Sequence, residues 1–170
     1  FTPVGSGTGL KAGATDGTTL YMLGNGVFKL TRSSMASGVS PVINTGGVAM
    51  NDMDHYGGRF VAVGDSGQIE LIRSGVATVI SSPTASDIVS VDMIGTATWW
   101  IGTDAGDLYW TDSAGSSWAS IGNVGANPGI MFASKYIGYI SSDDGIFLTV
   151  DGGCSWDSIY SGGTFCGIDL

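Results

Sequence analysis

Short apolar stretches alternate with turns rich in Gly, Asp and Ser along the whole chain, and one unit of this pattern recurs. In each unit an apolar stretch leads into a short polar turn, then a glycine, then a second apolar stretch. The unit is found at residues 20–26, 59–67, 99–106 and 137–145, and its marker glycines are Gly26, Gly67, Gly106 and Gly145. The spacing of these glycines, about 40 residues, indicates that the chain is built from repeats of one structural unit.

Four short stretches enriched in β-branched and aromatic residues can be placed in each repeat, and each has the length of a strand. The expected strands cover residues 10–15, 19–23, 27–31 and 39–43; 48–54, 60–64, 68–73 and 76–81; 88–94, 98–102, 107–111 and 117–121; and 129–134, 137–141, 146–150 and 155–160. Short links rich in Gly, Asp, Ser and Asn favour hairpins, and therefore antiparallel pairing. Glycine interrupts every window in which apolar residues have helical spacing, so no α-helix is expected.

A period of about 40 residues with four strands per repeat is typical of propeller blades, which stack radially and bury both faces of each sheet. We therefore predict an all-β fold, a β-propeller or propeller segment of four-stranded antiparallel blades. Residues 1–170 are interpreted as a single propeller-like domain with blades at 8–46, 47–85, 86–126 and 127–163, and 164–170 starting a further blade. Because that last strand needs a cover, a neighbouring chain or further sequence is expected to complete the ring. Closure through residues 1–4 is the alternative.

The composition of the chain limits its partners. The 170 residues include 29 Gly, and 15 Asp and Glu stand against 6 Lys and Arg, which gives a formal net charge of -9. Glycine suits a fold with many tight turns, because it adopts positive φ angles readily. The acidity disfavours a nucleic-acid partner, because phosphate binding requires a basic surface. No apolar run approaches the roughly 20 residues needed to cross a bilayer, so no membrane insertion is expected.

A sequence motif lies near the C-terminal end. Residues 149–156, Thr-Val-Asp-Gly-Gly-Cys-Ser-Trp, fit the pattern Ser/Thr-x-Asp-x-Gly-x-Ser/Thr-Trp, which is the Asp-box. Residues 111–118, Thr-Asp-Ser-Ala-Gly-Ser-Ser-Trp, form a degenerate copy in which Ser113 takes the aspartate position. The two copies lie in phase with the repeat, and the first two repeats lack the box. The chain therefore resembles the Asp-box (BNR-like) β-propellers, a group that includes sialidases, secreted glycoside hydrolases, sortilin-type receptors and photosystem assembly factors.

This resemblance implies a structural turn between the third and fourth strands of a blade, away from any active site. The residues concerned are Thr149, Asp151, Gly153, Ser155 and Trp156 in the full copy, and Gly115 and Trp118 in the degenerate one. Asp151 is expected to accept backbone N–H bonds across the turn, and Trp156 is expected to pack between blades. A calcium or sugar site at this turn is the alternative.

No catalytic residue is assigned, because the catalytic groups of the resembling enzymes do not map onto this chain. Sialidases bind a carboxylate with three arginines, whereas Arg32 and Arg73 fall at equivalent ends of the third strand and are interpreted as turn residues. His55, the one histidine, is interpreted as a surface turn residue. Glycosidases need two carboxylates about 5 to 10 Å apart, and no aspartate pair stands out by an apolar setting.

Aromatic residues are the candidates for a binding surface. Trp99, Trp100, Trp110 and Tyr136 have the chemistry that commonly holds sugars or protein partners, although packing between blades is the default role for most of them. A separate set of carboxylates, Asp54, Asp92 and Asp169, recurs at the ends of first strands and could hold a cation such as calcium. The alternative is that these aspartates satisfy turn backbones and keep the protein soluble. No other cofactor is expected.

The two cysteines, Cys154 and Cys166, allow two interpretations. A disulfide forms if both lie at facing strand ends, and it would imply an oxidising compartment. Two free thiols are the alternative.

The function predicted from these features is a non-enzymatic binding or structural module outside the cytoplasm. Low lysine, abundant Gly, Ser and Thr, and repeated blades resemble phage tail or capsid-surface proteins and secreted adhesion domains. The expected partners are other protein chains, copies of itself, or glycans. The alternative is a propeller fragment of a secreted glycoside hydrolase. A photosystem-type assembly factor is a third possibility, but it would show a basic patch that this sequence lacks.

Overall fold

The computed structural model describes residues 11–24, 26–31, 40–41, 48–163 and 165. These residues form four separate four-stranded antiparallel sheets, each with its strands in chain order. The predicted all-β fold of four-stranded antiparallel blades is thereby confirmed. The described residues contain no α-helix, and accordingly no helix long and apolar enough to cross a membrane.

Each sheet is a meander of consecutive strands, and we call the sheets blades 1 to 4. Blade 1 contains β1 (Gly13–Thr15), β2 (Thr19–Gly24), β3 (Gly26–Thr31) and β4 (Ser40–Pro41); blade 2 contains β5 (Met50–Tyr56), β6 (Arg59–Gly64), β7 (Ile69–Arg73) and β8 (Val76–Val79). Blade 3 contains β9 (Ile88–Met93), β10 (Trp99–Thr103), β11 (Asp107–Thr111) and β12 (Ala119–Asn123); blade 4 contains β13 (Gly129–Phe132), β14 (Gly138–Ser142), β15 (Gly145–Thr149) and β16 (Asp157–Ser161). A short 3-10 turn, η2 (Asp65–Gly67), joins β6 to β7.

The fourth strands of blades 3 and 4 begin later than the sequence predicts. Strands were expected to start at Ser117 and Ser155, whereas β12 starts at Ala119 and β16 at Asp157. The reason is that the Asp-box and its degenerate copy keep their last residues within the turn. The further blade predicted from residues 164–170 lies, apart from Phe165, outside the described residues and stays a prediction.

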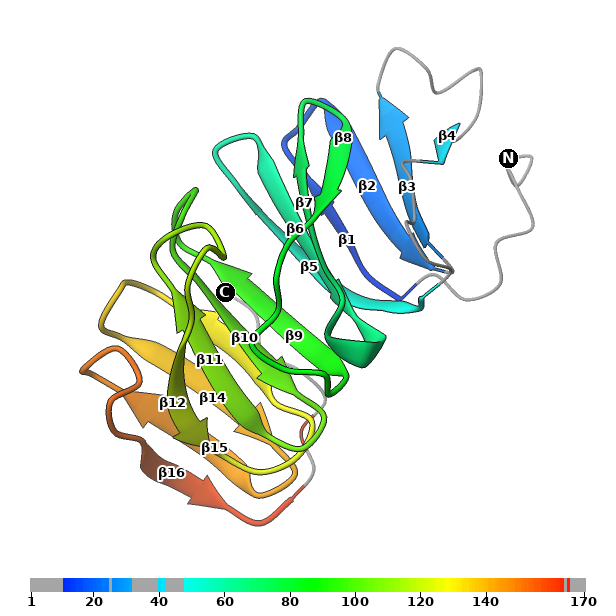
Figure 1. Ribbon diagram of the computed structural model, residues 1–170. Helices are drawn as coiled ribbons and strands as arrows, with labels where there is room; N and C mark the ends of the chain where they lie inside the picture. The colour runs from blue at the N-terminus through cyan, green and yellow to red at the C-terminus, as the bar shows by residue number, and fades with distance from the viewer. Residues whose placement is uncertain (1–10, 25, 32–39, 42–47, 164, 166–170) are drawn as a thin grey trace.

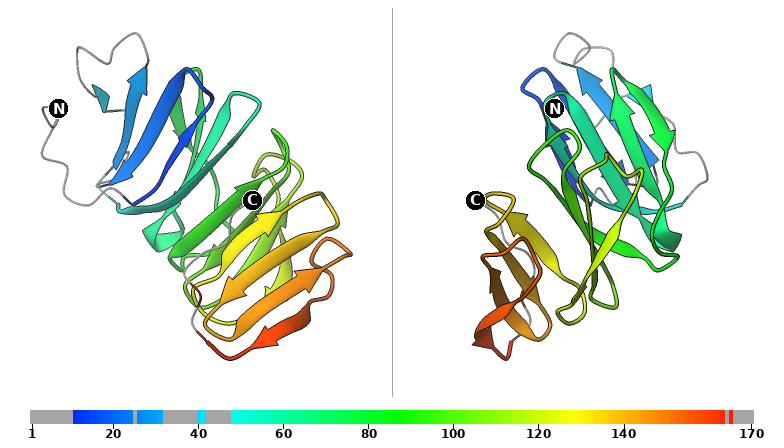
Figure 2. Two further views of the ribbon diagram at one scale, coloured as in Figure 1. Left: turned by 180° about the vertical axis from the view of Figure 1, so that it is seen from behind. Right: turned by 60° about the vertical axis from the view of Figure 1, so that its left-hand side comes forward.

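The blades stand side by side in an arc, with blades 1 and 4 at its opposite ends (Figures 1 and 2). The first strands of consecutive blades are neighbours, since β1 contacts β5, β5 contacts β9 and β9 contacts β13. Each blade is therefore related to the next by the radial stacking that a propeller requires.

Three apolar clusters fill the spaces between consecutive blades. Successive residues of a strand point to opposite faces of the sheet, so Trp99 joins the cluster shared with blade 2 and Trp100 joins the one shared with blade 4. This arrangement explains why strands such as β6 and β10 are apolar at consecutive positions. Both faces of the inner blades are covered by a neighbour.

Candidate functional site

The Asp-box of blade 4 is a turn held together by its own side chains. Asp151 Oδ1 accepts the backbone N–H of Ser155 at 2.9 Å and the hydroxyl of Thr149 at 2.8 Å, and Asp151 Oδ2 accepts the Ser155 hydroxyl at 2.6 Å. Gly153 N–H donates to Thr149 Oγ1 at 2.9 Å. The hydrogen bond from the Ser155 side chain, followed by that from its backbone, lowers the pKa of Asp151 to about 2.

The degenerate copy in blade 3 forms the same turn with a hydroxyl in place of the carboxylate. Ser113 Oγ accepts the backbone N–H of Ser117 at 2.9 Å and lies 2.8 Å from the Ser117 hydroxyl. Gly115 N–H donates to Thr111 Oγ1 at 3.1 Å, as Gly153 does to Thr149. A serine therefore reproduces the main bonds of the box aspartate.

Both turns pack against the outer edge of the preceding blade. Gly115 and Gly153 have φ angles of +78° and +93°, and each faces an isoleucine of that blade, Ile80 or Ile121 respectively. A Cβ at Gly153 would lie 2.7 Å from Ile121 Cδ1, and one at Gly115 would overlap Ile80. Beside the contact of Gly115 with Ile80, Trp118 Nε1 donates a hydrogen bond to the carbonyl of Ser81 at 3.1 Å. The contacts are those of a turn that joins neighbouring blades.

Trp156 has the corresponding place in blade 4. It packs against the cluster between blades 3 and 4, with its ring edge-on to Phe132 at 6.1 Å. The ring is only partly buried.

A row of carboxylates joins the first strands of blades 2, 3 and 4. Asp52 Oδ2 accepts the backbone N–H of Val91 at 2.9 Å, and Asp54 Oδ2 accepts that of Met93 at 2.7 Å. Asp92 Oδ2 accepts the backbone N–H of the next blade's Phe132 at 2.9 Å. Burial raises the pKa of Asp52 to about 6 and that of Asp92 to about 7, and these hydrogen bonds oppose the increase.

Asp54 and Asp92, two of the candidate cation ligands, thus accept hydrogen bonds from the backbone of the following blade. Within the described residues no three His, Cys, Asp or Glu side chains gather as a metal site would require. Asp169, the third candidate, lies outside the described residues. The observed partners of the carboxylates are therefore N–H groups, with a structural role between blades.

The candidate binding aromatics divide into two groups. Trp99 and Trp100 are completely buried, with Trp100 stacked on Phe132 at a centroid distance of 3.8 Å. Neither ring can reach a ligand, so the suggested binding role is wrong for these two and their role is core packing. Trp110 is partly exposed beneath Lys135 Nζ at 5.3 Å, and Tyr136 is 62% exposed in the turn before β14. Only Trp110 and Tyr136 keep accessible surface.

Cys154 is exposed in the Asp-box turn and forms no disulfide with any of the described residues. Its suggested disulfide partner, Cys166, lies outside the described residues.

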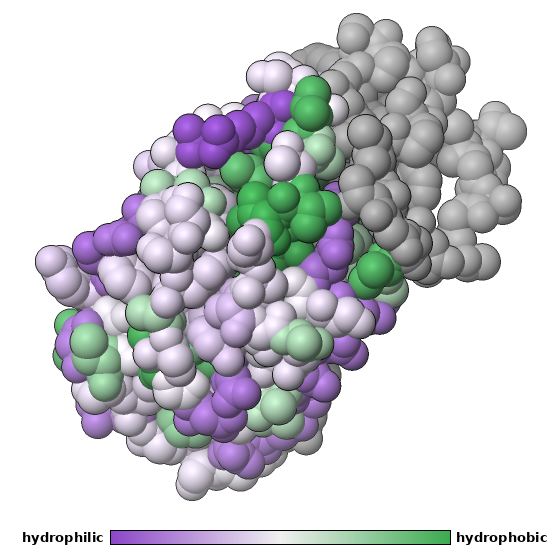
Figure 3. Space-filling view, viewed as in Figure 1, coloured by the Kyte–Doolittle hydropathy of each residue, from purple (hydrophilic) through white to green (hydrophobic). Residues whose placement is uncertain are grey.

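A groove between blades 2 and 3 is a candidate for binding a ligand. Its cavity has a volume of about 430 Å³, within the range of small-molecule and peptide pockets. Apolar surface gathers over β7 and β8, beside hydrophilic residues (Figure 3). The lining residues come from β7, β8 and the degenerate box turn: Leu71, Arg73, Val76, Thr78, Ile80, Ala114 and Ser116.

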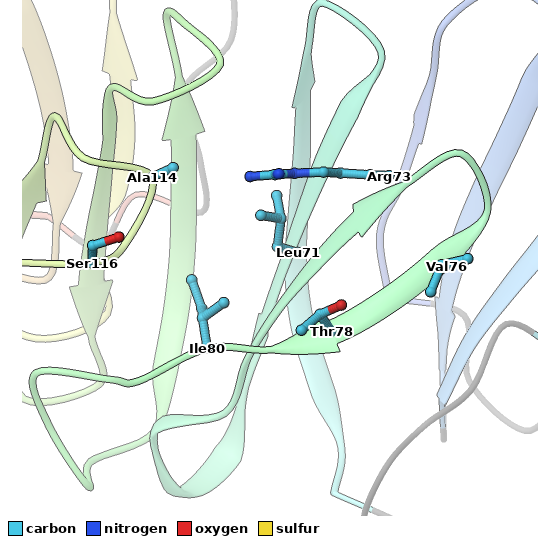
Figure 4. Close-up of a pocket in the computed structure, with 7 residues that line it drawn as sticks. All are labelled: Leu71, Arg73, Val76, Thr78, Ile80, Ala114 and Ser116. Atoms are coloured by element: carbon cyan, nitrogen blue, oxygen red, sulfur yellow. The ribbon is translucent and has the colours of Figure 1, made fainter.

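The side chains of the groove combine an apolar floor with donors at its rim. Arg73 extends across the groove toward Ala114, and Leu71 lies beneath its guanidinium (Figure 4). Ile80 points into the same space, and Ser116 faces it from the box turn (Figure 4). The lining contains no carboxylate, histidine or cysteine. The groove can therefore hold a ligand but offers no general acid or base.

Arg73 was interpreted from the sequence as a turn residue, and the groove was not predicted. A signal was present in the repeat itself. The strand pairing Val61–Leu71 in blade 2 corresponds to Trp100–Trp110 in blade 3, so Leu71 takes the place of a tryptophan. Comparing residues that face the same interface in successive repeats would have indicated a hollow here.

No protein-family model matches the chain, and no curated protein sequence matches it. Solved structures do match. An ancestral GH74 enzyme has a TM-score of 0.69 at 16% identity, covering 92% of this chain and 25% of that enzyme. The fold is that of a β-propeller segment.

Two further solved structures match this chain, one of a peptide complex and one of an apo protein. YCF48 bound to D1 peptide has a TM-score of 0.57 at 21% identity, covering 66% of this chain and 39% of that one. Apo AztD from Citrobacter koseri has a TM-score of 0.59 at 18% identity, covering 92% and 48%. The chain thus spans less than half the length of these three proteins, and the likeness shows the fold alone.

Proposed function

We propose that this chain is a non-enzymatic binding module that contacts a partner through the groove between blades 2 and 3. The observation that carries the proposal is the lining of this groove, which joins an apolar floor at Leu71 and Ile80 to the guanidinium of Arg73. Such a combination fixes and orients a ligand, as binding pockets do, without supplying groups for proton transfer.

The partly buried carboxylates support the same conclusion. Asp52, Asp54 and Asp92 each accept a backbone N–H from the next blade. The box aspartate, Asp151, is likewise occupied within its own turn. These acids are hydrogen-bonded within the scaffold, and binding is left to the surface between blades. A neighbour of the same fold, YCF48, was solved with a peptide bound, which is compatible with binding on this scaffold.

We further propose that the module acts on an extracellular or virion surface, as part of a phage tail, a capsid surface or a secreted adhesion domain. The support is compositional: 29 Gly, few basic residues and a net charge of -9 on a repeated scaffold. The partners proposed are protein chains, including copies of this one, or glycans.

A propeller fragment of a secreted glycoside hydrolase is the second candidate. It is favoured by the likeness to an ancestral GH74 enzyme, and by the pKa of Asp92, which burial raises to about 7, since catalytic acids are often tuned in this way. Against it, Asp92 lies between two blades with its carboxylate bonded to Phe132.

Parallel binding and hydrolysis measurements separate these functions. We expect the purified protein to bind a surface-protein or glycan panel while releasing no reducing ends from a set of plant and bacterial polysaccharides. An Asp92→Asn variant should bind equally well. Hydrolysis that disappears in Asp92→Asn would overturn the binding proposal in favour of the enzyme.

A further inference from the structure

The groove exists because one blade interface departs from the packing of the next. At the interface of blades 3 and 4, Trp110 lies under Lys135, whose Nζ is 5.3 Å from the ring centroid. The corresponding residues at the interface of blades 2 and 3 are Leu71, which is smaller than tryptophan and lines the groove, and Thr96, which does not line it and whose carbonyl accepts a hydrogen bond from Arg59 at 2.7 Å. The box turns pack in the same way at both interfaces, Gly115 against Ile80 and Gly153 against Ile121. Leu71, in the place of a tryptophan, therefore leaves a hollow that the repeat itself does not require.

The hollow holds an unpaired cation in an acidic protein. Within the part of the chain that the structure describes, the guanidinium of Arg73 has no hydrogen-bond or ion-pair partner. The equivalent position in blade 3 is Asp112, so the turn does not demand an arginine. A planar guanidinium above an apolar floor matches a carboxylate carried next to an apolar group. The hydroxyls of Thr78 and Ser116 add two further donors at the rim.

The edge of β8 indicates what kind of molecule carries the carboxylate. Ile80 N–H donates to the carbonyl of Ile69, in β7, at 3.1 Å. Backbone groups of successive strand residues point to alternate sides, so those of Ala77 and Val79 point away from β7, toward the open edge. An extended peptide can pair with these groups and place alternate side chains over the groove. Val76 and Val79, 61% and 46% exposed, leave this edge open. A glycan has no matching ladder of donors and acceptors.

We propose that the groove binds an extended acidic peptide segment, which pairs with the edge of β8 and places a carboxylate on Arg73 and an apolar side chain on Leu71 and Ile80. This inference rests on the proposed binding function and specifies the ligand class of the same groove.

The probe is a synthetic array of blocked heptapeptides. The central residue is Glu, Gln or Lys, and the flanking positions vary among Val, Ile, Thr and Ser. We expect the best Glu-centred peptides to bind about tenfold more tightly than their Gln partners, as measured by calorimetry, because a hydrogen bond between charged groups is replaced by a weaker one. Lys-centred peptides should not bind. Methylating the peptide amides that face β8 should abolish binding, whereas methylating the alternate amides should not.

Three variants test the assignment to this groove. Arg73→Gln, at an exposed position, should make Glu and Gln peptides bind equally. Leu71→Trp, which restores the residue type found at Trp110, should remove binding of both. Lys135→Gln makes the same charge change at the next interface and should leave binding unchanged.

Several outcomes would overturn the proposal. They are the absence of any peptide binding, equal binding of Glu and Lys peptides, or Glu-peptide binding that Arg73→Gln does not weaken. Thermal unfolding checks that Leu71→Trp is folded, and Arg73→Gln decides the matter if it is not. If the protein binds the surface-protein or glycan panel and Arg73→Gln has no effect there, the peptide proposal fails while the broader binding function stands.

Discussion

The carboxylate of Asp92 accepts a hydrogen bond from the backbone N–H of Phe132, 2.9 Å away, and so ties the first strand of blade 3 to that of blade 4. The same bond joins Asp54 to Met93 one blade earlier. A carboxylate on an inner strand thus supplies the acceptor that the edge of the next inner strand lacks. Because Asp92 lies between blades, it is partly desolvated, and its charged form is less favourable than in water.

The first prediction concerns stability against pH. Burial raises the pKa of Asp92 to about 7, above its unfolded value, so its contribution to stability is present at acidic pH and is lost as the pH rises through about 7. We expect the Tm of the protein to fall between pH 5 and pH 8. Asp92→Asn keeps an oxygen for Phe132 and removes the charge, so it should raise the Tm at pH 8 by about 3 °C or more.

The control for this change is Asp157→Asn, which removes one charge at an exposed position of β16. It should leave the pH profile nearly unchanged. A Tm that rises from pH 5 to pH 8 in the unmodified protein would contradict the prediction.

A second prediction concerns the Asp-box. Asp151→Ala removes the acceptor of three hydrogen bonds within the turn and should lower the Tm, whereas Asp151→Ser should lower it less. The reason is that Ser113 already makes the main bonds in the degenerate copy. Because hydrogen bonding holds the pKa of Asp151 at about 2, its stabilising effect should persist through neutral pH and fade only as the pH falls toward 2. Equally lowered Tm values for the two variants would show that serine does not replace the aspartate in this turn, and Tm values unchanged from the parent protein would show that the bonds of the box are unimportant.

A third prediction concerns the contact between Gly115 and Ile80. Gly115→Ala introduces a side chain at a φ of +78° and against Ile80, so we expect it to reduce the free energy of unfolding by about 2 kcal/mol or more. Gly122→Ala is the matched control, because Gly122 has a φ of +112° with open space around it and reports the backbone cost alone. Denaturant unfolding measures both. Adding Ile80→Val to Gly115→Ala should restore part of the free energy of unfolding that Gly115→Ala loses beyond Gly122→Ala, because valine lacks the Cδ1 atom that the new side chain meets. If nothing is restored, the contact with Ile80 is not the cause of the loss.

A fourth prediction concerns Trp100 in the core. Its ring is 1% exposed and stacks on Phe132, while its indole N–H has no hydrogen-bond partner among the described residues. Trp100→Phe keeps an aromatic ring and removes the unpaired N–H, so it should cost much less than Trp100→Ala, for which we expect a loss of about 3–5 kcal/mol. Denaturant unfolding decides this. Similar losses for the two variants would mean that the stacking contributes little.

The strands could be predicted from sequence because each one is a short apolar stretch bounded by turn residues, and because the repeat allows one copy to check another. The start of β12 could not be located, since Ser117 has a strand-like neighbourhood but its N–H is captured by Ser113 within the turn. That bond depends on the folded turn and leaves no trace in hydrophobic periodicity.

The candidate site was harder to predict, because it depends on what lies across an interface. Trp99 and Trp100 were considered for binding, although the predicted stacking of blades already favoured burial on both faces of the sheet, which is what β10 shows. Leu71, by contrast, was not considered for binding although it lines the groove. A leucine in a strand is unremarkable until it is compared with Trp110, the residue that fills the same place one blade later.

The stacking of the blades has a mechanical consequence. Each described blade packs only against the blade before it and the blade after it, through three separate apolar clusters. In such a one-dimensional arrangement each interface opens largely on its own. A force applied along the arc would act on these interfaces in series, so the molecule should extend in successive steps of one blade, with the weakest interface giving way first.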